Sequence, residues 1–117
     1  MTDAPKAPFR VIDFSQVMAG PFCTRLLADV GAEVIKVEPE GGESMRGRPP
    51  VRDGASSYFG ALNAGKRSIV LDPRDAQDRA HFARLAARAD LIIEDWGPGG
   101  LEDAGIDPEV LGFSDPC

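Results

Sequence analysis

Short apolar runs alternate with stretches of helical periodicity along this chain. Residues 10–14 (RVIDF) form an apolar, β-branched run that ends at polar residues, as a buried strand does. From Phe22 to Val30 the apolar residues recur at helical spacing, which predicts a helix that packs on a sheet and ends at Gly31. Residues 33–38 (EVIKVE) predict a second strand. This order of strand, helix and strand indicates a βαβ unit with parallel strands.

The rest of the chain continues the alternation of strands and helices. Asp72 followed by Pro73 predicts the N-cap and the first residue of a long amphipathic helix. Residues 40–56 are rich in Gly, Pro, Arg and Ser and predict a long irregular loop. The remaining predicted elements are a short helix at 57–62, strands at 68–71 and 91–94, and helical turns near 101–104 and 107–111.

Together these elements predict an α/β fold, a Rossmann-like open parallel sheet with helices on both faces. A chain of 117 residues has room for one domain. We expect a flexible N-terminus over 1–9, a folded part over 10–111 and an irregular C-terminus over 112–117. Four strands leave an unpaired edge and apolar surface, so we expect the isolated chain to be poorly soluble or to associate.

The acidic charge is concentrated in the second part of the chain. The net charge is −6, with 10 Lys/Arg against 9 Asp/Glu in residues 1–74 and 3 against 10 in residues 75–117. Nucleic acid requires a clustered basic face, so no nucleic-acid partner is expected, and phosphate recognition is expected only from residues 1–74. The chain has neither the ~18 uncharged apolar residues of a membrane helix nor a secretory signal pattern. We therefore expect a cytoplasmic protein that binds no membrane.

Residues typical of metal sites and nucleophilic catalysis are few. Cys23 and Cys117 are far apart in the chain and neither lies in a CxxC or Cys/His pattern, which predicts reduced thiols and no metal. His81 is the single histidine and lies within a predicted helix, three residues after Asp78. This placement favours a surface or packing role, and no Ser–His–Asp arrangement includes it.

Candidate binding residues lie after the predicted strands, because open parallel sheets bind ligands beyond the carboxyl ends of their strands. The first loop reads SQVMAGP rather than GxGxxG, so a standard dinucleotide site is not expected. The helix that starts near Pro21 is either preceded by a plain turn or holds phosphate or thioester oxygens on its free N–H groups. Trp96 either stacks on an adenine ring or covers the core. Six basic residues either contact phosphate or are merely solvated: Arg46, Arg48, Arg52, Lys66, Arg67 and Arg74.

Three segments taken together resemble the family III CoA-transferases, a family that includes formyl-CoA transferases, carnitine CoA-transferases and α-methylacyl-CoA racemases. The segments are VIDFSQVMAGPFCTRLLADVGAEVIKVEPEGGESMRG, YFGALNAGKRSIVLD and ARADLIIEDWGPGGLEDAGID, and the resemblance extends over residues 10–111. It implies the N-terminal part of a Rossmann-like large domain, incomplete relative to the full-length family. It also implies a CoA thioester as ligand and, in full-length enzymes, an interlocked homodimer.

Carried over position by position, the resemblance implies ten coenzyme A contacts: Val17, Met18, Ala19, Pro39, Leu71, Asp72, Arg74, Asp95, Trp96 and Gly97. Arg74 would contact a phosphate or the adenine edge, and Trp96 would stack on the ring. The family usually has Asn-Phe and a basic residue where this chain has Asp95, Trp96 and Gly97, and often an Arg at Asp103. A carboxylate near the CoA phosphates is repulsive, so these departures predict weaker CoA binding.

The resemblance implies transfer of CoA between an acyl-CoA and a carboxylic acid, with acyl-CoA racemisation as the alternative. In that family the nucleophilic carboxylate and the racemase acid/base pair follow later than residue 117, so no catalytic residue is assigned and the chain is not expected to be active alone. A different class of function remains open: a non-catalytic assembly module that pairs with a catalytic chain. A truncated remnant is the third reading. Partners are therefore a CoA thioester, and a second copy or another chain.

Overall fold

The computed structural model describes residues 8–107. Its elements are β1 (Arg10–Asp13), α1 (Ala19–Asp29), β2 (Glu33–Glu38), the 3₁₀ helix η1 (Ser44–Gly47), β3 (Val51–Arg52), β4 (Ala55–Ser56), α2 (Ser57–Asn63), β5 (Arg67–Val70), α3 (Ala76–Ala86), β6 (Leu91–Ile93) and α4 (Gly100–Asp103). Residues 1–7 of the predicted N-terminus, the predicted C-terminus at 112–117 and most of the expected turn at 107–111 lie outside the described residues. Among residues 8–107, no helix has both the length and the apolar character needed to cross a bilayer.

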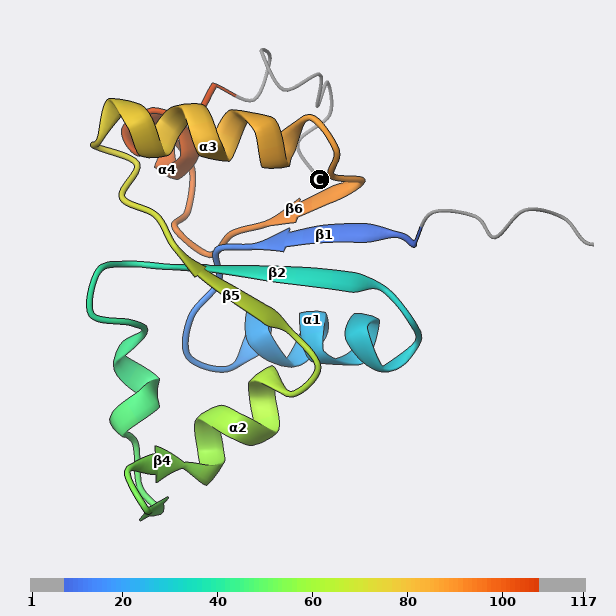
Figure 1. Cartoon of the computed structure of the whole chain (residues 1–117), viewed down its shortest axis with the longest axis vertical. Helices are drawn as coiled ribbons and strands as arrows, with labels where there is room; N and C mark the ends of the chain where they lie inside the picture. Colours follow the sequence, from blue (N-terminus) through green and yellow to red (C-terminus); the bar gives the residue numbers. More distant parts are fainter. Residues whose placement is uncertain (1–7, 108–117) are drawn as a thin grey trace, which may run out of the picture.

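Four strands form one sheet in the order β5, β2, β1, β6, and each neighbouring pair is parallel. This is the order in which the first four strands of doubly wound sheets are arranged. α1 lies on one face of the sheet with α2 beside it, and α3 and α4 lie on the other face (Figure 1). The predicted open parallel sheet with helices on both faces is thus confirmed. All four strands end at the same edge, on the left of Figure 1.

The core lies between the sheet and α3. The Phe14 and Phe82 rings meet there with their centroids 5.0 Å apart. The other buried members of this cluster are Ile12, Val37, Leu71, Ala86 and Ile106. The helical spacing predicted an apolar face on α3, which is confirmed in part: Phe82 and Ala86 are buried, whereas Ala76, Ala80 and Ala83 are exposed. This packing fixes the two central strands and therefore the loops that follow them.

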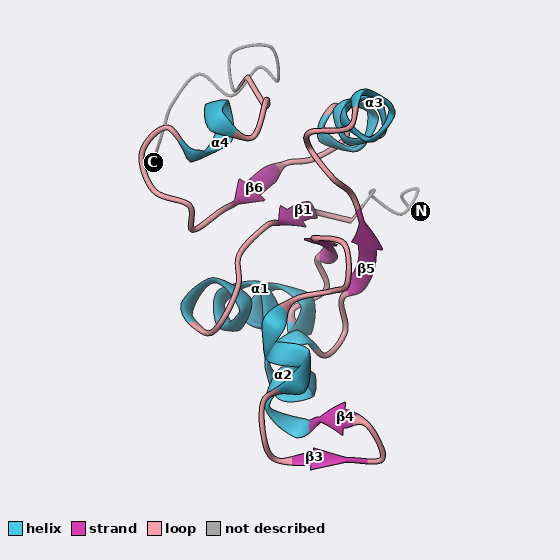
Figure 2. Cartoon of the chain, turned by 90° about the vertical axis from the view of Figure 1, so that its left-hand side faces the viewer, coloured by secondary structure: helices cyan, strands magenta, loops and turns pink. Residues whose placement is uncertain are grey.

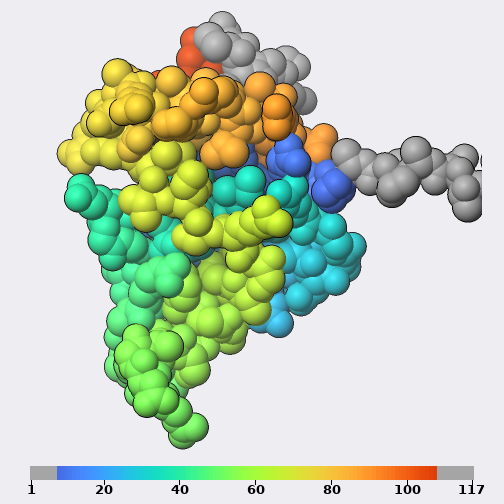
Figure 3. Space-filling model, viewed as in Figure 1, coloured from blue at the N-terminus to red at the C-terminus, as the bar shows by residue number. Residues whose placement is uncertain are grey.

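The segment predicted as an irregular loop, 40–56, contains ordered structure, and that prediction was wrong. η1 is followed by an antiparallel hairpin of β3 and β4, which extends from the lower end of the molecule (Figure 3). Asp53 and Gly54 form its two-residue turn, with φ values of 52° and 77°. Asp-Gly favours such left-handed turns. The strands of this hairpin have two residues each, too few for an alternating pattern to show.

The long helix α3 begins at Ala76, so the predicted start at Asp72 and Pro73 was wrong. Asp75 is the N-cap, and its carboxylate accepts the Gln77 N–H at 2.7 Å and the Asp78 N–H at 3.3 Å. Asp72 instead accepts the Arg74 N–H at 2.9 Å. Both aspartates are good caps by type. The tight turn at Asp72 leaves Asp75 as the residue that precedes the first helical turn.

α1 packs on the sheet as predicted, but most of its predicted apolar stripe is exposed and only Leu27 is half-buried. Phe22, Leu26 and Val30 are 53%, 50% and 82% exposed. The buried residues of this helix are Pro21 and Thr24. The Thr24 hydroxyl donates to Asp13 Oδ2 at 2.5 Å, so a polar contact and not the stripe joins α1 to β1.

Candidate functional site

Four loops meet at the carboxyl edge of the sheet, which faces the viewer in Figure 2. They follow β1, β2, β5 and β6 and comprise residues 14–18, 39–43, 71–75 and 94–99. The residues predicted to contact ligand lie in these loops, except Ala19, which begins α1: Val17, Met18, Ala19, Pro39, Leu71, Asp72, Arg74, Asp95, Trp96 and Gly97. Parallel pairing therefore brings all ten to one edge.

The first loop is held in a conformation that a β-branched residue rarely adopts. Val17 has a φ of 72°, in the left-handed region. Its N–H donates to Glu43 Oε1 at 2.6 Å, and the preceding Gln16 N–H donates to Asp95 Oδ2 at 2.8 Å. Val17 and Met18 are 46% and 54% exposed. The loop is thus fixed by carboxylates from two other loops while its own side chains remain accessible.

Gly20 allows this loop to lie close to the start of α1. A Cβ built on Gly20 would overlap the Ser15 side chain. Met18 is the N-cap of α1 and makes no side-chain capping hydrogen bond. The N–H groups of the first turn are therefore without a side-chain cap at the loop edge, where they can donate to an anionic oxygen.

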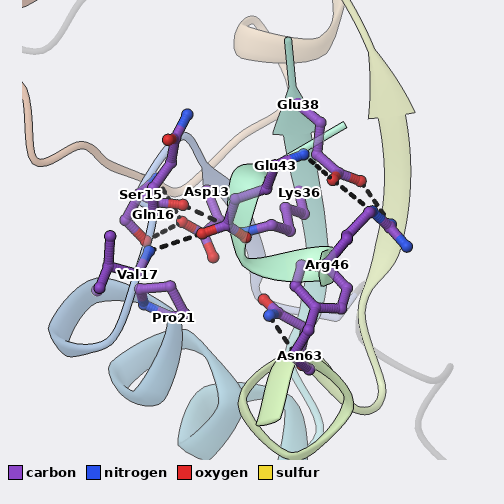
Figure 4. A network of polar contacts seen from close by, with 12 residues as sticks. Asp13, Ser15, Gln16, Val17, Pro21, Lys36, Glu38, Glu43, Arg46 and Asn63 are labelled. Atoms are coloured by element: carbon purple, nitrogen blue, oxygen red, sulfur yellow. Dashed lines mark hydrogen bonds and ion pairs between the residues drawn. The ribbon is translucent and has the colours of Figure 1, made fainter. Parts of the chain in front are cut away.

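A pair of buried charges lies directly beneath the first loop (Figure 4). The side chains of Lys36 and Glu43 are 2% and 1% exposed, and Lys36 Nζ lies 2.9 Å from Glu43 Oε2. This oxygen accepts no hydrogen bond from the described residues and is held by the ion pair alone. Lys36 also donates to the Ser15 carbonyl oxygen at 3.0 Å. Losing one partner of such a pair leaves an uncompensated buried charge, which costs about 3–5 kcal/mol.

A second buried pair joins β1 to the residues before β5. Lys66 Nζ lies 3.1 Å from Asp13 Oδ2, with exposures of 2% and 0%. Asp13 also accepts hydrogen bonds from the Ser15 N–H at 2.8 Å and from the Ser15 and Thr24 hydroxyls. Burial lowers the pKa of the Lys66 ammonium, and the Asp13 charge acts in the opposite direction. Lys66 is a structural cation here, so it is not available to a phosphate.

The second loop is fastened by Glu38, the last residue of β2. Its carboxylate accepts two hydrogen bonds from the Arg46 guanidinium, each at 2.7 Å, and one from the Glu43 N–H at 2.8 Å. The hydrogen bond from Arg46 is the largest cause that lowers the pKa of Glu38, to about 2. Arg46 also lies over the Phe59 ring at 4.2 Å, and Arg48 lies over the Tyr58 ring at 4.5 Å. Both arginines therefore have structural partners.

The third loop presents an accessible cation, Arg74. The Arg74 side chain is 88% exposed, and its Nε lies 3.1 Å from Asp72 Oδ1. The hydrogen bond from Arg74 is the largest cause that lowers the pKa of the Asp72 carboxyl. Solvent surrounds this pair, so an incoming phosphate can replace Asp72 as the partner of Arg74.

The fourth loop carries the single tryptophan of the sequence. The Trp96 ring packs against Phe14 with centroids 4.9 Å apart, and it remains 38% exposed. It therefore covers the core and offers a free ring surface at the same time. Gly97 has a φ of 84°, which glycine adopts without strain. Asp95, where the family usually has Asn, accepts the Gln16 N–H of the first loop. This residue therefore has a structural role.

Sequence reasoning did not single out the buried network of Asp13, Lys36, Glu43 and Lys66. One signal was available, because Asp13 and Lys36 are charged residues inside apolar strands, and they are paired neighbours across β1 and β2. A charge inside a strand covered on both faces requires a buried partner. Glu43 gave no such signal, since it lies in a polar segment.

The other residues weighed in the sequence lie away from this edge or make other contacts. His81 is exposed on α3 and contacts Arg84, as the surface reading predicted. Cys23 is an exposed free thiol on α1. Arg67 lies 3.9 Å from Glu33 at the beginning of β5. Within residues 8–107, no cluster of three His, Cys, Asp or Glu residues has the arrangement of a metal site.

Comparison with known proteins identifies similar chains. The chain is 43% identical to the succinyl-CoA:mesaconate CoA-transferase of Haloarcula hispanica over 92% of its length, and 41% identical to the acetyl-CoA:oxalate CoA-transferase of Acetobacter aceti over 96%. A crystal structure of a hypothetical protein from Mycobacterium tuberculosis superimposes with a TM-score of 0.82 at 41% identity, over 96% of this chain.

These matches cover a limited part of each relative. The chain spans 32% and 30% of the two transferases and 31% of the solved structure. The family model of CoA-transferase family III matches residues 7–116, which is nearly the whole chain. The parallel sheet, the loops at its carboxyl edge and this match together show that the chain belongs to CoA-transferase family III.

Proposed function

We propose that this chain forms the coenzyme A-binding portion of an enzyme that transfers CoA between an acyl-CoA and a carboxylic acid. The observation that carries the proposal is the convergence of four loops at one sheet edge, with an accessible cation and an accessible aromatic ring among them. The relatives named above are transferases of CoA, which favours transfer over racemisation. Their acyl groups differ, so the proposal extends to the CoA thioester and no further.

Each loop would supply one kind of contact. Arg74 is proposed as the cation for a CoA phosphate, because it is exposed and its partner Asp72 lies in solvent, whereas Arg46 and Lys66 pair with buried carboxylates. Trp96 would stack on the adenine through its free surface. The uncapped N–H groups at the start of α1 would donate to phosphate or thioester oxygens, with Val17 and Met18 beside them.

The chemical step would need residues other than those described here. An Asp or Glu nucleophile requires a carboxylate that can attack the thioester. At this edge Asp13, Glu38 and Glu43 are buried and paired with cations, Asp72 pairs with Arg74, and Asp95 and Glu94 accept backbone N–H groups. Glu40 is exposed and interacts electrostatically with Arg74. Because most of these carboxylates already have partners, the chain is proposed to bind and orient CoA, and to be inactive alone. Residence in the cytoplasm stays a prediction.

Association with a second copy or another chain belongs to the same proposal. The exposed stripe of Phe22 and Leu26 on α1 and Val30 at its C-cap supports it, because exposed apolar residues spaced four apart lie on one face of a helix and can form an interface. An assembly module without CoA affinity is the competing function. Both functions would use this apolar stripe for association, so only a measurement of CoA binding separates them.

Calorimetric titration of the purified chain with CoA and acetyl-CoA tests the proposal. We expect micromolar binding that Arg74→Glu weakens about 10- to 100-fold, since charge-assisted hydrogen bonds to phosphate are lost and a repulsive charge is added. Arg88→Glu is the matched control, because Arg88 is also exposed but lies after α3, near the start of β1.

Dephospho-CoA separates the two phosphate positions of the ligand. If Arg74 contacts the 3′-phosphate, Arg74→Glu will weaken CoA binding but leave dephospho-CoA binding nearly unchanged. If it contacts the diphosphate, both ligands will be affected. A folded chain that binds none of these ligands would contradict the proposal and favour the assembly module.

A further inference from the structure

We propose that Glu43 is a positioning residue that holds the first loop in its binding conformation, so that it sets CoA affinity without touching CoA. This inference rests on the proposed function and concerns a residue outside the predicted contacts. The observation behind it is the hydrogen bond from the Val17 N–H to Glu43 Oε1, 2.6 Å long. Figure 4 shows this contact reaching from the Glu43 side chain to the loop after β1.

The conformation of Val17 requires an external restraint. Its φ of 72° lies where a β-branched side chain crowds its own backbone, and the same loop without restraint would relax to a negative φ. Such a change would rotate the peptide group before Met18 and move the start of α1. The proposed contacts at Val17, Met18 and Ala19 would then be displaced together.

Glu43 is itself rigidly placed. Its backbone N–H donates to Glu38 Oε1 at 2.8 Å, and Glu38 is the last residue of a central strand. Its Oε2 is held by Lys36 Nζ at 2.9 Å, and Lys36 belongs to the same strand. Both residues that hold Glu43 therefore belong to β2. Glu43 in turn fixes the loop that follows the neighbouring strand β1 relative to the sheet.

The restraint is shared with two other contacts. Lys36 donates to the Ser15 carbonyl, and Asp95 accepts the Gln16 N–H. Three successive residues of the loop are thus held by side chains. Val17 is the one with strained backbone, so Glu43 is the contact whose loss should matter most for ligand binding.

A double-mutant cycle of Glu43→Ala and Val17→Gly tests this role. Glycine occupies positive φ without steric cost, so the loop of Val17→Gly should keep its conformation without the restraint. We expect Glu43→Ala to weaken CoA binding at least 10-fold in the natural background and less than 3-fold in the Val17→Gly background. Equal weakening in both backgrounds would overturn the proposal.

Thr24→Val is the control for general loss of stability. Thr24 belongs to the neighbouring buried network, where its hydroxyl hydrogen-bonds to Asp13 and to the Gly20 and Pro21 carbonyls and not to Val17. This variant should lower the melting temperature but leave the CoA dissociation constant within about 2-fold of the natural chain. If Thr24→Val weakens CoA binding as much as Glu43→Ala at a similar loss of melting temperature, Glu43 acts through stability alone and the proposal is wrong.

Amide hydrogen exchange in the absence of ligand examines the contact itself. Val17 N–H should exchange at least 10-fold faster in Glu43→Ala than in the natural chain, whereas amides within β1 should change little. Unchanged exchange at Val17 would overturn the inference and leave the proposed function standing. Faster exchange in a chain that binds no CoA would mean that the proposed function has failed, and the positioning role in CoA binding with it.

Discussion

The ion pair between Glu38 and Arg46 makes a quantitative prediction about stability and pH. The pKa of Glu38 falls from 4.5 to about 2, and the hydrogen bond from Arg46 is the largest cause. One pKa unit corresponds to about 1.4 kcal/mol, so the whole difference has an upper scale of about 3 kcal/mol. Arg46 is 47% exposed, and solvent screening reduces its share. We expect Arg46→Met to lower the free energy of unfolding by about 1–2 kcal/mol at pH 7.

The effect should depend on pH in a defined direction. The pKa of Glu38 is lower in the folded chain than in the unfolded one, so its contribution is complete above pH 4.5 and is lost as the pH falls toward 2. The difference in the free energy of unfolding between the natural chain and Arg46→Met should therefore be largest at pH 6–7. It should shrink as the pH falls from about 4.5 toward 2. Urea-induced unfolding, followed by far-UV circular dichroism from pH 7 to pH 3, measures it.

Arg48→Met provides the matched control. Arg48 also lies over an aromatic ring, at 4.5 Å from the Tyr58 centroid, but no carboxylate pairs with it among the described residues. Its replacement should change the free energy of unfolding by less than about 0.5 kcal/mol, with no dependence on pH between 7 and 3. A constant difference for Arg46→Met across the pH range, or an equal effect of Arg48→Met, would refute the argument.

Two further predictions concern the fluorescent ring and the apolar stripe. Trp96 is the single tryptophan and has a free ring surface, so CoA should quench its fluorescence, whereas pantetheine, which lacks adenine, should not. Equal quenching by both ligands would mean that the adenine does not stack on Trp96. The combined replacement of Leu26 and Val30 by Lys should shift the chain to a smaller species in size-exclusion chromatography, because these exposed apolar residues promote association. An unchanged elution volume would remove the stripe as the association surface.

The architecture could be predicted from local patterns. Residues 33–38 form a strand where the apolar run ends at a Pro-Gly segment, and Phe82 and Ala86 face the core because their spacing follows the helical period. The ten predicted contact residues come together at one edge because parallel strands must all end there. These features depend on periodicity and chain connectivity, which sequence carries directly.

The charged network depended on tertiary structure. Glu43 stands in a polar segment that reads as an exposed loop, yet the turn that follows β2 buries its carboxylate against Lys36 and Val17. The face that α1 turns toward the sheet was also not predicted, because it carries Thr24, which donates to Asp13, and not the apolar stripe. The contacts of Thr24 with Asp13 and of Val17 with Glu43 join residues 11 and 26 positions apart, and even the nearer pair of Lys36 and Glu43 forms only through the turn that follows β2.

The sequence by itself therefore determined the four strands of the parallel sheet, most of the helices and the edge at which a ligand is expected, but not the hairpin of β3 and β4 or the start of α3. Only the tertiary structure decided which charged side chains form structural ion pairs and which remain accessible to a ligand. Lys66 is buried against Asp13 and Arg46 is half-buried against Glu38, whereas the pair of Arg74 and Asp72 remains in solvent, although the sequence weighed all three alike as phosphate contacts or solvated cations. The physical reason is that burial and pairing of a charge depend on neighbours brought together in space, which no local pattern encodes.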